Sequence, residues 1–210
     1  RVPSGEIVLR QPPRDVPDKP NRQEGAEYLE RGGEVDAIAP KCLPLSNGNY
    51  TVLLTESGKS WSRWNSVEMV RFQEEPDGAA GMEFYLKTPA GIMPLQPAPS
   101  FSREAEYSWE FGDRSGVISA SWKGINTSIT TVVPPAGEGE MRKVEIRAAG
   151  KINGECELIC AFEPVLQKRK DYESHPSFSK LSLEVDTIGG TLVIRRRPSG
   201  DTNQMFMALA

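Results

Sequence analysis

Short runs in which apolar and polar residues alternate constrain the fold of this chain more than any other feature of its sequence. The clearest run is residues 105–111, which read Ala-Glu-Tyr-Ser-Trp-Glu-Phe. A period of two is typical of a β-strand with one face in the core and the other in solvent. The same pattern recurs along the chain, at residues 82–86, 118–122, 125–133, 156–162 and 181–185.

Turn-forming residues separate these runs, as in Gly-Asp-Arg-Ser-Gly at 112–116 and Gly-Gly at 189–190. No segment of 12 or more residues has the apolar spacing of an amphipathic helix, apart from a weak pattern around residues 23–31. Many short strands with regular turns are typical of a sandwich or barrel. The sequence therefore predicts an all-β fold, specifically an antiparallel β-sandwich.

The first 44 residues differ from the rest. They hold seven of the 17 prolines and many acidic residues, with almost no apolar periodicity. Such a segment offers too little apolar surface to offset the entropy cost of ordering it. We therefore predict a proline-rich acidic linker or arm at 1–44 and a β-sandwich domain at 45–210.

Composition argues against several partners and compartments. A formal net charge of -4 and a pI near 5.3 argue against nucleic-acid binding, and the longest apolar runs are too short to cross a bilayer, so no membrane contact is expected from this segment. The cysteines are Cys42, Cys156 and Cys160, an odd number. If the last two share a strand, their Cα atoms lie roughly 13 Å apart, too far for a disulfide. Free thiols favour a reducing compartment, so we expect a cytoplasmic protein.

Few residues suggest catalysis. The only histidine, His175, rules out a multi-histidine metal site and is interpreted as a hydrogen-bonded loop residue ahead of a strand. Glu74, Glu75 and Asp77 lie in a Pro/Gly turn where solvation would leave them with ordinary pKa values. The basic clusters at 168–170 and 195–197 are interpreted as solubilising strand edges. We expect neither a metal nor a nucleotide cofactor.

The four tryptophans divide into two pairs. Trp109 and Trp122 fit strand alternation and are predicted to lie in the core. Trp61 and Trp64 flank a polar segment with Arg63, interpreted as a loop that offers flat apolar faces and hydrogen-bond donors to a sugar. A loop that its tryptophans merely pin to the fold is the equal alternative.

Three separated motifs resemble one protein family. They are Leu-Ser-Asn-Gly-Asn-Tyr at 45–50, Gly-Lys-Ser-Trp-Ser-Arg-Trp at 58–64 and His-Pro-Ser-Phe-Ser-Lys-Leu at 175–181. In this order they resemble motifs of the N-terminal β-sandwich of cellobiose-phosphorylase-like glycoside phosphorylases. The similarity is greatest to the β-1,2-glucan branch, which comprises 1,2-β-oligoglucan phosphorylases and the phosphorylase-like part of cyclic β-1,2-glucan synthases. Trp61 stands where that branch has a tyrosine, and the third motif there begins a strand.

The resemblance covers residues 45–210 and implies a sandwich of the galactose-mutarotase-like supersandwich type. It also implies that the sandwich continues beyond Ala210, so that this chain is truncated at its C-terminus. In the family, the sandwich packs against an (α/α)6 barrel that holds the general acid and the phosphate site for inverting phosphorolysis. The parent protein is then a glycoside phosphorylase or glycosyltransferase, and it is membrane-attached if it is a cyclic glucan synthase.

The resemblance implies a non-catalytic role for this chain. Ser62, Arg63 and Trp64, with Trp61 beside them, are expected near a β-glucan oligosaccharide bound by the parent enzyme. The expected partners are this oligosaccharide, the barrel of the same parent chain, and a second copy in a homodimer. A stand-alone carbohydrate-binding module and a purely structural or oligomerisation domain remain alternatives. A stand-alone epimerase is disfavoured because only His175 could serve its chemistry.

Overall fold

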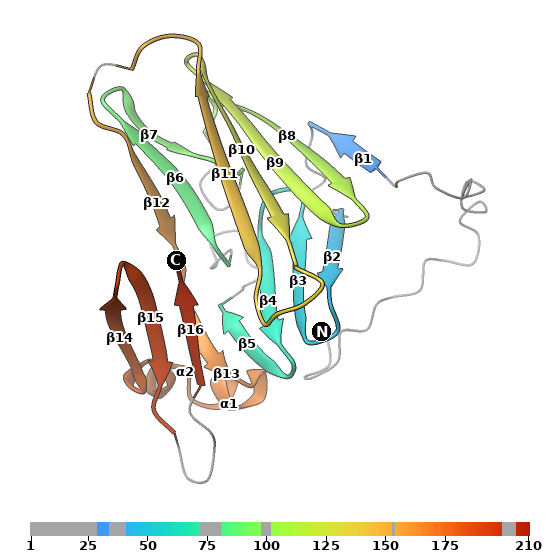
Figure 1. Ribbon diagram of the computed structural model, residues 1–210, viewed down its shortest axis with the longest axis vertical. Coiled ribbons are helices and arrows are strands. Elements are labelled where there is room, and N and C mark those ends of the chain that lie inside the picture. The colour runs from blue at the N-terminus through green and yellow to red at the C-terminus, as the bar shows by residue number, and fades with distance from the viewer. Residues whose placement is uncertain (1–28, 34–40, 72–80, 98–101, 153, 199–204) are drawn as a thin grey trace, which may run out of the picture.

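The computed structural model describes residues 29–33, 41–71, 81–97, 102–152, 154–198 and 205–210. Within these residues the chain forms sixteen strands and two six-residue helices, and every pair of neighbouring strands is antiparallel (Figure 1). The predicted all-β antiparallel fold is confirmed. No helix in the described ranges is long and apolar enough to span a membrane.

Two five-stranded sheets form the larger part of the described molecule. One has the strand order β1 (Leu29–Gly32), β8 (Glu106–Gly112), β9 (Ser115–Trp122), β10 (Ile125–Val132) and β11 (Met141–Ala148). The other has the order β13 (Pro164–Gln167), β5 (Val67–Val70), β4 (Ser60–Trp64), β3 (Tyr50–Thr55) and β2 (Cys42–Ser46).

Two three-stranded sheets complete the described strands. One has the order β12 (Glu157–Ala161), β6 (Glu83–Thr88) and β7 (Gly91–Pro94). The other has the order β14 (Leu183–Ile188), β15 (Thr191–Arg196) and β16 (Met205–Leu209).

The core lies between the inner faces of the sheets. Burial alternates strictly along β9, as period-two patterning requires. The two large sheets approach closely at Gly116 of β9, where an added Cβ would lie 2.5 Å from Leu54 of β3 and 3.0 Å from Leu43 of β2. Trp109 and Trp122 are buried, each with 5% of its surface exposed, which confirms their predicted place in the core.

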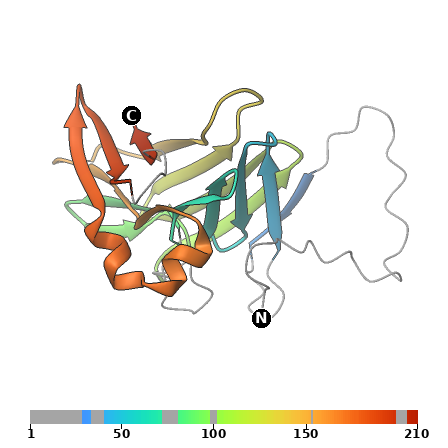
Figure 2. The same ribbon diagram turned by 90° about the horizontal axis from the view of Figure 1, so that it is seen from below.

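The helices α1 (Arg169–Ser174) and α2 (Pro176–Leu181) connect β13 to β14 at one end of the molecule (Figures 1 and 2). The segment 175–181 was expected to be a loop and the start of a strand, and that expectation is wrong. Exposed His175 joins the two helices, and the next strand begins at Leu183. The reason is local: Pro176 occupies the first turn of α2, where its missing N–H costs nothing and its fixed φ favours a helix.

Part of the predicted arm lies in strands. β1 pairs with β8, and β2, which starts at Cys42, pairs with β3. Residues 1–28 and 34–40 lie outside the described residues. The division of the chain at residue 44 therefore stays a prediction.

Candidate functional site

The segment predicted to be a substrate-binding loop is a strand. Residues 60–64 form β4, which pairs with β3 on one side and β5 on the other. The loop interpretation is wrong because serines alternate with larger side chains here, which is itself a period-two pattern. Ser60 and Ser62 are small enough to fit the fully buried inner face of this strand.

Alternation along β4 sends the four predicted site residues to two opposite faces. Ser62, fully buried like Ser60, and half-buried Trp64 lie on the inner face, where Trp64 packs against the core. Trp61 and Arg63 lie on the outer face and are also half-buried. A ligand bound to one face of this sheet therefore contacts one pair of residues, and a sugar contact by either pair stays a prediction.

On the inner face, a buried ion pair joins the two large sheets. Arg142 of β11 donates from Nη2 to the Ser60 hydroxyl at 2.8 Å, and the same nitrogen lies 2.7 Å from Oε2 of Glu140. The Arg142 Nε donates to that oxygen at 2.8 Å, and the Tyr50 hydroxyl donates to Oε1 at 3.2 Å. The side chains of Arg142 and Glu140 are only 5% and 7% exposed. Burial raises the pKa of Tyr50, and the charge of the nearby Glu140 carboxylate raises it further.

The first motif builds the turn that positions this ion pair. The Asn47 side-chain oxygen accepts hydrogen bonds from the backbone N–H groups of Asn49 and Tyr50 at 3.1 and 2.9 Å. Its amide nitrogen donates to the carbonyls of Pro134 and Gly137 at 2.8 and 3.0 Å. Asn47 therefore ties the β2–β3 turn to the β10–β11 connection and brings Tyr50 next to the ion pair.

Beside the ion pair is a cleft of about 840 Å³. Apolar side chains from β5, β16 and the start of β6 line it, together with Trp64, Glu140 and Arg142. Sequence reasoning missed the ion pair, because residues 138–143, Glu-Gly-Glu-Met-Arg-Lys, carry no local pattern that indicates burial. Both carboxylate oxygens of Glu140 already accept hydrogen bonds, so this group is suited to joining the sheets rather than to proton transfer.

On the outer face, Trp61 contacts both a guanidinium and a carboxylate. The Arg63 guanidinium lies over the Trp61 ring, 5.4 Å from its centroid, and the Trp61 Nε1 donates to Oε1 of Glu68 at 3.2 Å. Glu68 of β5 stands opposite Arg63 in the strand register and is 8% exposed. Burial raises the pKa of Glu68, and the Trp61 hydrogen bond partly opposes that rise. Sequence reasoning missed Glu68, because only the tertiary fold buries it.

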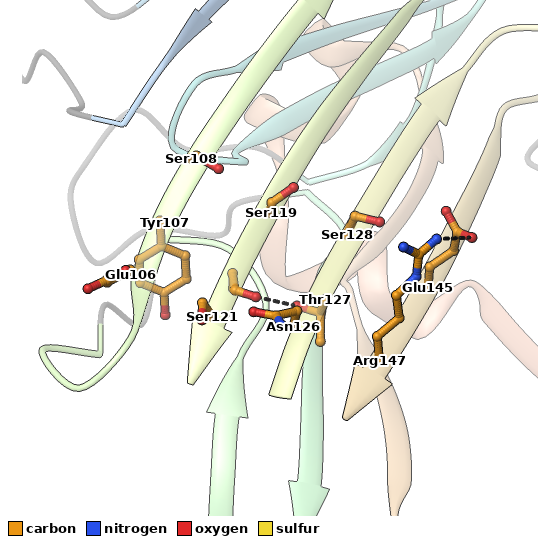
Figure 3. A pocket seen from close by; sticks show the side chains of 11 residues that line it. Glu106, Tyr107, Ser108, Ser119, Ser121, Asn126, Thr127, Ser128, Glu145 and Arg147 are labelled. Atoms are coloured by element: carbon orange, nitrogen blue, oxygen red, sulfur yellow. Dashed lines mark hydrogen bonds and ion pairs between the residues drawn. The ribbon is translucent and has the colours of Figure 1, made fainter. Parts of the chain in front are cut away.

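A second polar feature lies on the exposed face of β8–β11. A shallow depression of about 440 Å³ lies there. Figure 3 shows Ser108, Ser119 and Ser128, which line it and project from three neighbouring strands. These hydroxyls make no hydrogen bond to any described residue. Glu145 and Arg147 line the same depression, and Nη2 of Arg147 lies 3.9 Å from Oε1 of Glu145. The sequence indicated a solvated face, and the structure shows that its small side chains leave a hollow.

The third motif holds α2 against the sheets. Ser179 of α2 donates to the Gln167 side chain at 2.9 Å and accepts from Nη2 of Arg196 at 3.0 Å. Arg196 also donates to the carbonyls of Val165 and Ser179. The interpretation of 195–197 as a solubilising edge is therefore wrong for Arg196, a half-buried clamp between β13, α2 and β15.

Metal-binding chemistry finds no support in the described ranges. They contain no group of three or more His, Cys, Asp or Glu residues placed to hold a metal ion. Cys156 and Cys160 form no disulfide, as predicted, although Cys156 precedes β12 rather than lying in it. Cys42 forms no disulfide with a described residue either. Glu74, Glu75 and Asp77 lie outside the described residues.

Comparison with known proteins agrees with the motifs. The family model for the glycosyl hydrolase 94 supersandwich domain matches residues 27–210. The chain is also similar to the cyclic beta-(1,2)-glucan synthase NdvB of Rhizobium meliloti (strain 1021), with 26% identity over 221 aligned positions that cover 95% of this chain. The chain spans 8% of the length of that relative. The match extends through every described sheet, and this chain therefore belongs to the glycosyl hydrolase 94 supersandwich-domain family.

Proposed function

We propose that this chain is the non-catalytic β-sandwich domain of a larger glycoside phosphorylase or glycosyltransferase that acts on β-glucans. The family match over residues 27–210 carries the proposal, and the likeness to a cyclic beta-(1,2)-glucan synthase supports β-1,2-glucan as the substrate class. When the parent reaction is phosphorolysis, a carboxylic acid protonates the glycosidic oxygen while phosphate attacks the anomeric carbon from the opposite face and takes the glycosyl group with inversion. A separate barrel of the larger parent protein supplies that acid.

The contribution of this domain is contact with the glucan at the rim of the catalytic site, through the outer face of β4. The Arg63 guanidinium makes no hydrogen bond or ion pair with any residue in the described ranges, so its N–H groups are free to donate to sugar hydroxyls. Stacking on Trp61 restricts the guanidinium and lowers the entropy cost of binding. The inner pair, Ser62 and Trp64, serves the packing of the sandwich.

Because Arg63 and Trp64 lie on opposite faces of β4, variants of the two residues can be compared in the full-length parent enzyme. Arg63→Ala should raise KM for the oligosaccharide, with little change in Tm. Trp64→Ala should lower Tm by several degrees or more, because Trp64 packs against the core and truncating such an aromatic costs about 3 kcal/mol. Arg114→Ala, at an exposed arginine in the β8–β9 turn, is the matched control and should change neither quantity. An unchanged KM in Arg63→Ala would contradict the glucan contact.

A second test addresses catalysis by the domain alone. The 210-residue chain, incubated with sophorose-type oligosaccharides and phosphate, should release no glucose 1-phosphate above a denatured control. Turnover would overturn the assignment of the acid to another domain.

A stand-alone carbohydrate-binding module is the second candidate, favoured by the free hydroxyls of the depression on β8–β11. In that case the isolated chain binds β-glucan oligosaccharide in a calorimeter, and Ser119→Tyr, which fills the depression, abolishes the binding. If neither the depression nor Arg63 affects binding or kinetics, a purely structural or oligomerisation domain remains. A cytoplasmic location and a homodimer stay predictions.

A further inference from the structure

We propose that Glu68 is a positioning residue, which holds the Trp61 ring so that Arg63 presents its N–H groups to the glucan. The inference rests on the proposed function of the outer face of β4. Glu68 itself does not touch the substrate in this proposal. It acts through one hydrogen bond to an indole.

Register places the three side chains together. Glu68 of β5 lies directly opposite Arg63 of β4, and Trp61 lies two residues before Arg63 on the same face. No salt bridge joins Glu68 to Arg63. Instead, the carboxylate accepts from the Trp61 Nε1 at 3.2 Å, and the guanidinium lies over the ring. The indole therefore separates an anion at its edge from a cation at its face.

Burial makes this hydrogen bond selective for one ring orientation. Glu68 is 8% exposed, and the charged groups that face it are Arg63 on β4 and Arg169 and Glu173 on α1. Arg169 and Glu173 pair with each other at 2.7 Å, so the cation of α1 is engaged elsewhere. Within the described residues, Trp61 is the only donor of a hydrogen bond to this carboxylate. A buried carboxylate that loses its donor is costly, so rotation of the ring away from Glu68 is penalised.

The fixed ring in turn determines where the guanidinium lies. A cation is attracted to the face of an indole, so Arg63 is drawn over Trp61 rather than to solvent. The ring therefore determines the position of the guanidinium, and the N–H groups of Arg63 are not used in a salt bridge. Loss of Glu68 should free the indole and then the guanidinium, which weakens glucan binding and leaves the chemical step intact.

The kinetic test uses the full-length parent enzyme and the variants Glu68→Leu, Trp61→Phe and their combination. Each single variant should raise KM for the oligosaccharide on the order of tenfold with kcat unchanged, the equivalent of one hydrogen bond to a charged group. The double variant should add nothing further, because both changes break the same contact. Glu157→Leu is the matched control: it removes a strand carboxylate that pairs with Lys87 at 2.9 Å and should leave KM unchanged. Additive effects, or an unchanged KM in Glu68→Leu, would overturn the proposal.

A spectroscopic test separates the failure of this proposal from the failure of the proposed function. In the nitrogen-15 spectrum of the 210-residue chain, the Trp61 indole N–H should shift in Glu68→Gln and stay fixed in Glu157→Leu. The Gln variant retains side-chain volume and a weaker acceptor, so it remains informative where Leu prevents folding. If the indole signal does not move, Glu68 does not position Trp61. If it moves while Arg63→Ala leaves KM unchanged, the positioning holds and the glucan contact fails.

Discussion

At the scale of single residues, the two faces of β4 carry two kinds of charged group. The inner face meets Arg142 and Glu140, which are almost fully buried and bonded to each other, to Ser60 and to Tyr50. Such a pair offers little net stability over apolar residues of the same size, yet breaking it is costly. The outer face carries Arg63, which lies over an aromatic ring and retains free donors.

We predict that Arg142→Met destabilises the chain by about 3–5 kcal/mol, because it leaves the Glu140 carboxylate buried without its cation. The double variant with Glu140→Leu should recover most of that loss, since it removes both charges. Urea denaturation monitored by circular dichroism measures both values. If the double variant is as unstable as the single one, the lost stability comes from packing and not from the unpaired charge.

Glu68 should make stability depend on pH. Because burial raises its pKa above the ordinary value of 4.5, the folded chain binds the proton more tightly than the unfolded chain. The free energy of unfolding contributed by Glu68 is therefore greatest below the unfolded pKa and falls as pH rises through the folded pKa.

Glu68→Gln removes this titration, so the unfolding free energy of the wild type minus that of the variant should decrease from about pH 4 upward. The other charged groups that face Glu68, namely Arg63, Arg169 and Glu173, are present in both proteins. Urea unfolding at several pH values measures the difference. A difference that is constant with pH would show that the folded and unfolded pKa values are the same.

At the scale of elements, the turns before β4 and β6 depend on glycine for steric reasons. Gly58 has a φ of +83°, and an added Cβ there would lie 2.5 Å from Cβ of Gln96. Gly81 has a φ of +84°, and its added Cβ would lie 2.0 Å from the Ser60 carbonyl oxygen. The first glycine of the second motif is therefore explained by packing, without reference to a ligand.

Gly81→Ala should lower the free energy of unfolding by several kcal/mol, because both the positive φ and the clash with the backbone disfavour alanine at this position. Gly137→Ala is the matched control, since Gly137 has a φ of +119° and nothing lies within 4 Å of its added Cβ. The free energy of unfolding of the control should fall by less, because only the cost of the backbone conformation applies there. Thermal unfolding of the two variants compares them, and equal losses of Tm would contradict the role of the close contact.

At the scale of the whole molecule, the edge strand β16 stands out. It pairs only with β15 among the described strands, it reads Met-Phe-Met-Ala-Leu without a charge, and Phe206 is 64% exposed. An unprotected apolar edge invites pairing with another segment. In Figure 1 the end of β16 approaches β12, and both strands line the cleft of about 840 Å³.

We predict that this edge is covered in solution, either by a second copy of the chain or by residues 1–28 of the proline-rich arm, which precede β1. Light scattering should show a dimer in the first case. In the second case, limited proteolysis of the arm should expose the edge and cause association. Phe206→Lys should abolish dimer formation without loss of the fold, because the side chain is exposed. A stable monomer whose arm is removed without consequence would contradict both alternatives.

The sequence alone determined the fold class and the family. The alternation in β8, β9 and β10 identifies strands because the side-chain period of a strand does not depend on its neighbours. The three motifs carry the family resemblance that the match over 27–210 confirms. Local patterning failed where a short polar segment could be a loop or a strand, as at Ser60–Trp64, and where a proline began a helix, as at Pro176.

Only the tertiary structure decided which face each candidate residue occupies and what it meets there. Arg142 reaches Ser60 across 82 positions in sequence, a contact that depends on how two sheets stack and that no local pattern encodes. The partnership of Trp61 with Glu68 likewise requires β4 and β5 to pair in one register, and the charges that act on Glu68 include Arg169 and Glu173 of α1. Periodicity along a strand is a local property of the chain, whereas burial and charge pairing are set by segments that are distant in sequence.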